Sequence, residues 1–148
     1  MSLLAKLQED MKLALKSREA LRLSTLRLVL SSVSYARIDK GGELTDDEVL
    51  GVISREAKQR RESVEAAERG GRTDIAEREG SELKIIEQYL PKQLDEAEVE
   101  ALARSIITDV GAVDIKDRGK VMGPLMAQTR GRADGKLASQ IVERLLRG

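Results

Sequence analysis

Apolar residues recur every three or four positions along most of the chain, which is the spacing of helices buried on one side. The first two stripes are formed by Leu4, Leu7, Met11 and Leu15, then by Leu23, Leu26, Leu30 and Val33. No repeat, low-complexity tract or convincing strand interrupts the pattern. The sequence therefore predicts an all-α protein.

Glycines and capping residues mark where the first helices begin and end. Gly41-Gly42 ends the region of the first two stripes, and Thr45 with Glu48 has the spacing of a capping box. Gly70-Gly71 interrupts the helix that follows, and the next helix runs to Tyr89. A short glycine turn favours antiparallel neighbours, so we expect these two helices to form a hairpin.

Pro91 marks a division of the chain, because proline disfavours helical geometry in the residue before it. We expect a helical hairpin or bundle subdomain of about four helices over residues 1–92. A tail subdomain of three helices should occupy residues 93–148. Asp95 with Glu98 provides a second capping box at the start of that tail.

Two further helices are expected in the tail, one beginning near Asp114 and one beginning at Asp134. Pro124 lies within the first of them. Its nitrogen cannot donate a hydrogen bond and its ring crowds the preceding turn. We therefore expect Pro124 to kink or split that helix.

Composition excludes several kinds of chemistry. The chain has no cysteine and no histidine, so it lacks thiolate metal ligands, a cysteine nucleophile and the usual acid–base side chain. The most apolar run, residues 21–33, contains Arg22 and Arg27, so we expect no membrane span. No phosphate-binding loop or serine elbow is present. We predict no catalytic residues, no metal, no cofactor and a cytoplasmic location.

Positive charge gathers near the carboxyl end of a chain whose net charge is zero. Residues 95–115 hold six acidic groups and one basic group, whereas residues 116–148 hold three acidic and eight basic groups. The turn from Gly131 to Lys136 joins two predicted helices, and free amides at a helix start favour anions. The candidate RNA-binding residues are Lys116, Arg118, Lys120, Arg130, Arg132 and Lys136.

Other interpretations of these charges remain open. The acidic and basic blocks can attract each other across a helix interface, and the turn can be a plain helix corner with a capping aspartate. A second charged surface is predicted on the expected hairpin, where it could dock a protein partner. Its candidate residues are Lys58, Arg60, Arg61 and Arg72.

Motifs along nearly the whole chain resemble those of the GatB/YqeY family, most closely its stand-alone YqeY-like members. The tail motifs are Asp117–Gly123 and Gly131–Lys136. The upstream motifs are Leu26-Arg27, Lys58–Ser63, Gly71-Arg72, Glu79 with Glu82-Leu83, and Tyr89–Leu94. In the B subunit of the tRNA-dependent amidotransferase, a tail of this kind helps to hold the tRNA body.

The resemblance implies tRNA contact and a family link to carbon–nitrogen ligase activity with glutamine as amide donor. Releasing ammonia needs an activated nucleophile, and activating a carboxylate needs a nucleotide site, and the sequence offers neither. Our first hypothesis is therefore an accessory tRNA-binding module that is not catalytic alone. The alternatives are an adapter that docks an aminoacyl-tRNA synthetase or amidotransferase subunit, and an amidotransferase component active only in complex. We expect no DNA or membrane partner.

Overall fold

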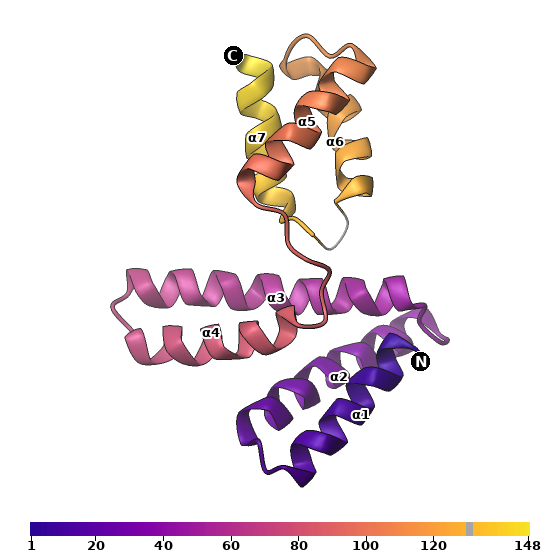
Figure 1. The fold of residues 1–148 in the computed structure, drawn as a ribbon, viewed down its shortest axis with the longest axis vertical. Helices are drawn as coiled ribbons and strands as arrows, with labels where there is room; N and C mark the ends of the chain where they lie inside the picture. Colours follow the sequence, from indigo (N-terminus) through magenta and orange to yellow (C-terminus); the bar gives the residue numbers. More distant parts are fainter. Residues whose placement is uncertain (130–131) are drawn as a thin grey trace. The chain divides into compact units, whose positions relative to one another are not determined.

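A computed structural model describes residues 1–129 and 132–148, and those residues form seven α-helices and one short 3₁₀ helix (Figure 1). The predicted all-α fold is confirmed. The chain divides into two compact units, Met1–Leu90 (unit 1) and Pro91–Gly148 (unit 2). The elements are α1 (Leu3–Lys16), α2 (Ala20–Lys40), α3 (Asp46–Arg69), α4 (Thr73–Glu87), α5 (Glu96–Val110), η1 (Ile115–Asp117), α6 (Arg118–Gln128) and α7 (Gly135–Arg147).

Unit 1 consists of two antiparallel helix pairs, α1 with α2 and α3 with α4 (Figure 1). The predicted α3–α4 hairpin is therefore confirmed. The core of this unit contains side chains from all four helices. Its most buried large members are Leu7, Leu26, Val29, Val33, Val49, Ile53 and Ile86.

One predicted core position in α1 is wrong. Leu15 is 55% exposed, whereas the neighbouring Ala14 is fully buried. Seven residues bring a helix almost back to the same face, so Ala14 continues the buried side that Leu7 begins. The next residue turns about 100° further, so Leu15 lies about 80° from Leu7 around the helix and faces solvent.

The predicted ends of the helices in unit 1 follow from local chemistry. The Thr45 hydroxyl accepts a hydrogen bond from the Glu48 N–H (3.2 Å), and the Glu48 carboxylate accepts one from the Thr45 N–H (3.0 Å). The predicted capping box at the start of α3 is therefore confirmed. Gly41 ends α2 with a φ of 77°, a left-handed conformation that glycine adopts without steric cost.

Unit 2 is a three-helix arrangement of α5, α6 and α7 around its own apolar core. Asp95 caps the start of α5, because its carboxylate accepts a hydrogen bond from the Glu98 N–H (2.8 Å). The predicted capping box is only half formed, since the Glu98 side chain does not accept a bond from the Asp95 N–H. The fully buried members of this core are Val99, Ala103, Val121, Leu125, Ala138 and Val142.

Pro124 does not split its helix, contrary to one of the two outcomes predicted for it. It lies inside α6, which continues to Gln128. The carbonyl that loses a helical donor belongs to Lys120, four residues earlier. Lys120 and Pro124 are both exposed, so water can bond to that carbonyl and the helix tolerates the proline.

The segment that precedes α5 is fastened to the loop before α7. The Leu94 N–H donates a hydrogen bond to the carbonyl of Arg132 (2.7 Å). In addition, the Arg132 Nε donates to the carbonyl of Lys92 (3.4 Å). Residues 92–94 therefore belong to the folded structure of unit 2, although they precede its first helix.

Candidate nucleic-acid interface

The first turn of α7 carries one of the predicted RNA-binding residues. Asp134 caps the helix, as predicted, because its carboxylate accepts a hydrogen bond from the Lys136 N–H (3.3 Å). The side chain of Lys136 is exposed. Arg130 and Gly131, which the sequence analysis assigned to the same corner, lie outside the described residues.

The turn before α6 carries a second predicted cation, Lys116. The Asp114 carboxylate accepts a hydrogen bond from the Lys116 N–H, and the Asp117 carboxylate accepts one from the Val113 N–H, both at 2.9 Å. The Val113 N–H, with a further contribution from Lys120, holds the pKa of Asp117 below its usual range. These bonds order the backbone, while the side chain of Lys116 stays exposed.

Arg118 joins this turn to α7. Its guanidinium donates a hydrogen bond to the Ser139 hydroxyl, and its Nε lies 3.2 Å from a carboxylate oxygen of Glu143. Ser139 and Glu143 lie three and seven residues after Lys136, which places all three on the same side of α7. The cations at the start of α6 and at the start of α7 therefore belong to one surface of unit 2.

Lys120 is the remaining predicted cation at the start of α6. Its ammonium lies 3.4 Å from the Asp117 carboxylate, in a pair three residues apart. The Lys120 side chain is 69% exposed, so solvent screens this pair strongly and a phosphate can compete for the ammonium.

The acidic stretch of residues 95–115 pairs with Arg144 of α7, which is not one of the predicted RNA-binding residues. Arg144 lies 3.4 Å from Glu96 and 3.3 Å from Glu100. Within the described part of the chain, no carboxylate forms an ion pair with Lys116 or Lys136. The alternative interpretation, in which the two charge blocks neutralise each other, therefore applies to Arg144 and not to these two lysines.

Arg132, another predicted RNA-binding residue, makes a structural contact. Its guanidinium reaches the carbonyl of Lys92, and its own carbonyl accepts the bond from Leu94 described above. The side chain is only partly exposed. Sequence reasoning identified the charge of Arg132 but not this contact, because the partner lies 40 residues away.

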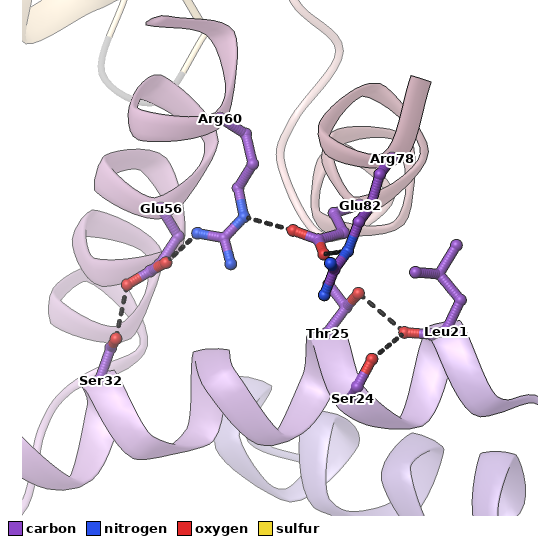
Figure 2. A network of polar contacts seen from close by, with 8 residues as sticks. All are labelled: Leu21, Ser24, Thr25, Ser32, Glu56, Arg60, Arg78 and Glu82. Atoms are coloured by element: carbon purple, nitrogen blue, oxygen red, sulfur yellow. Dashed lines mark hydrogen bonds and ion pairs between the residues drawn. The ribbon is translucent and has the colours of Figure 1, made fainter. Parts of the chain in front are cut away.

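One of the four residues predicted for the second charged surface, on the α3–α4 hairpin, does not lie at the surface. Arg60 is buried, with 9% of its surface exposed, so the expectation that it faces a partner from the solvent side is wrong. Figure 2 shows its guanidinium between two carboxylates, Glu56 on its own helix and Glu82 on α4. Glu56 also accepts a hydrogen bond from the Ser32 hydroxyl of α2.

The other three residues of the second charged surface lie at or near the surface of unit 1. Lys58 and Arg72 are exposed, and Arg61 is half-buried. Arg72 forms an ion pair with Asp74 at 3.2 Å. The Arg72 guanidinium holds the pKa of Asp74 below its usual range, so that carboxylate stays charged.

The described residues contain no cluster of three or more carboxylates placed to hold a metal ion. Across residues 1–129 and 132–148, no helix has both the length and the apolar character needed to cross a bilayer. The carboxylate of Glu82 contacts Arg60 and Arg78.

Several fungal proteins are similar to this chain along most of its length. "Altered inheritance of mitochondria protein 41, mitochondrial" of Lachancea thermotolerans is 30% identical over 95% of this chain and 79% of its own length. The protein of the same name in Kluyveromyces lactis is 35% identical over 72% of this chain and 60% of its own. That of Pyrenophora tritici-repentis is 25% identical over 97% and 80%.

These names contradict one prediction from the sequence. Each of the three relatives is described as mitochondrial, so the cytoplasmic location is corrected. That prediction rested on the absence of cysteine and on the absence of an apolar run that could span a membrane. Neither property distinguishes one reducing compartment from another.

The family itself is established by a match over almost the whole chain. The family model described as Yqey-like protein matches residues 4–146, which cover most of both units. The resemblance noted from the motifs of the two units is thereby confirmed. This chain belongs to the YqeY-like protein family.

Proposed function

We propose that unit 2 binds a folded RNA of the tRNA class through the surface formed by η1 and the first turns of α6 and α7. The observation that carries the proposal is that Lys116 and Lys136 are exposed and, among the described residues, unpaired. Both are exposed on this surface, and neither is paired with a carboxylate of the described residues. Arg118 and Lys120 lie beside them in exposed pairs that a phosphate can displace.

The composition of this surface favours recognition of shape and charge. The chain has two tyrosines and no phenylalanine or tryptophan, and both tyrosines belong to unit 1. Stacking on unpaired bases needs aromatic side chains, so sequence-specific binding of single strands is disfavoured. A folded RNA presents phosphates and ribose hydroxyls at fixed spacing, which lysine and arginine can contact without reading bases.

The strength of the salt effect follows from the number of cations. If three or four of them neutralise phosphates, log K should fall with log salt concentration with a slope of about −2 to −4. The smaller value applies if Arg118 keeps its pair with Glu143 in the complex.

Fluorescence titration of labelled total tRNA at several salt concentrations tests the proposal. Changing Lys116, Lys120 and Lys136 together to alanine should weaken binding at least tenfold and reduce the slope by about two to three. The matched control changes the exposed lysines Lys12, Lys16 and Lys84 of unit 1 to alanine, which alters net charge equally. Equal effects of the two triple variants, or no salt-sensitive binding by the wild type, would refute the proposal.

The adapter hypothesis predicts a different result. A pull-down of the tagged chain after nuclease treatment should lose its partners if they are held through RNA. Retention of a synthetase or amidotransferase subunit would favour the adapter. The enzymatic hypothesis predicts ammonia transfer only when other subunits supply both active sites. The purified chain with glutamine and ATP should therefore show no turnover, and turnover there would refute the prediction that the chain lacks catalytic groups of its own.

A further inference from the structure

Helix α2 presents to solvent a regular uncharged seam made of four large apolar or aromatic side chains and two serines. The seam occupies six positions separated alternately by three and four residues, and all six are exposed. Leu28 is 51% exposed, Tyr35 is 71% exposed and Ile38 is 74% exposed. The seam residues are Leu21, Ser24, Leu28, Ser31, Tyr35 and Ile38.

This seam is separate from the side of α2 that packs in unit 1. Leu26, Val29 and Val33 are buried on that side and form part of the core. None of the six seam residues is charged, although 35% of the whole chain is charged. A spacing of three and four sustained over the helix is the pattern by which one helix packs against another. Large apolar side chains that gather on one exposed helix face make that face a candidate interaction site.

The order of side-chain sizes along the seam indicates which partner fits. Large and small residues alternate from Leu21 to Tyr35, with serines between the larger side chains. A two-fold axis midway between Leu28 and Ser31 brings each of these residues opposite the other. The same axis places Ser24 opposite Tyr35, so large side chains meet serines over the middle of the seam, while Leu21 and Ile38 meet at its two ends.

We propose that a second copy of this chain covers the seam, with the two α2 helices antiparallel. Large side chains opposite serines allow close approach of the helices, as small residues do elsewhere. In a parallel pair Leu28 would meet Leu28 and Ser31 would meet Ser31, which alternates crowding with gaps. The seam carries no charge, so association should depend little on salt, in contrast to the RNA binding proposed for unit 2.

Sedimentation velocity of the full chain over a range of concentrations tests whether the seam associates. We expect a reversible dimer, and Leu28→Glu should raise its dissociation constant at least tenfold. The control is Leu13→Glu on α1, because Leu13 is 53% exposed, close to the 51% of Leu28, but lies outside the seam. Circular dichroism should show both variants folded. A wild-type monomer at every concentration, or equal effects of the two variants, would overturn the proposal.

Disulfide cross-linking tests the antiparallel register, and the absence of native cysteine makes the experiment simple. Chains with Ser24→Cys are mixed with chains with Tyr35→Cys under mild oxidation. The register predicts mixed disulfide dimers, because these positions face each other. It predicts few dimers of Ser24→Cys alone, since the two copies of that residue would be about 16 Å apart along the helix axis. Efficient cross-linking of Ser24→Cys with itself would instead indicate parallel helices and overturn the proposal.

Discussion

Replacement of Arg60 tests the polar packing of unit 1. Arg60 compensates two carboxylates, Glu56 and Glu82, whose side chains are 13% and 8% exposed. Removing one partner of a buried ion pair typically costs about 3–5 kcal/mol, because the remaining charge stays buried. Arg78 lies 3.6 Å from Glu82, but its side chain is 78% exposed, so it compensates only about 0–1 kcal/mol.

Arg60→Met should therefore lower the free energy of unfolding of unit 1 by about 3–5 kcal/mol. Urea unfolding followed by tyrosine emission reports on this unit alone, because Tyr35 and Tyr89 both lie within it. With an ordinary dependence on urea, the midpoint should fall by about 2 M.

Two further variants distinguish the cost of leaving a buried carboxylate unpaired from the cost of losing a positive charge. Arg78→Met removes the exposed partner of the same Glu82 and should cost less than about 1 kcal/mol. Adding Glu82→Gln to Arg60→Met should recover part of the loss, because it removes one of the two uncompensated carboxylates. If Arg60→Met and Arg78→Met are equally mild, the argument that burial sets the cost of losing Arg60 is wrong.

Three other predictions concern hydrogen bonds that hold single elements. The Lys40 ammonium, with the capping contact to Thr45, lowers the pKa of Glu48 from 4.5 to about 2. The charged Glu48 carboxylate therefore stabilises the fold fully above pH 4.5, and this stabilisation is lost as pH falls toward 2. Glu48→Gln keeps a capping acceptor but has no charge to lose, so its melting temperature should change less with pH over that interval than that of the wild type. A pH profile equal to that of the wild type would contradict this. Asp95→Ala should cost unit 2 about 1 kcal/mol in urea unfolding followed by circular dichroism, whereas an unchanged transition would show that the cap contributes nothing. The Tyr89 hydroxyl donates to Asp10 at 2.5 Å, so Tyr89→Phe should cost about 1.5–3 kcal/mol in the same assay, and a loss below 0.5 kcal/mol would argue against this bond.

The sequence predicted the features that depend on neighbouring residues. The capping box of Thr45 and Glu48 and the glycine end of α2 involve residues a few positions apart, so their chemistry can be read directly. Burial of Arg60 could not be read in this way. It depends on Glu82, which is 22 residues distant and reaches Arg60 only because α3 and α4 pack as a hairpin. The spacing of Glu56 and Arg60 by four was the local signal of a pair.

The same distinction applies to the candidate site. The pair of Lys120 with Asp117 spans three residues and follows from helical spacing. The contacts of Arg118 with Ser139 and Glu143 require α6 to pack against α7, which periodicity alone does not orient. The sequence therefore indicated where positive charge is concentrated, but the packing of the helices decides which of those charges remain unpaired.

The fastening of Leu94 and Lys92 to Arg132 sets the limits of any fragment used to study the tail in isolation. A peptide that starts at the first residue of α5 would lack both partners and leave the carbonyl of Arg132 without its donor. Spectra of such a peptide would then report a disturbed loop beside the lysines of interest. A fragment that begins at Pro91 keeps these bonds and is the appropriate length for nuclear magnetic resonance titrations with RNA.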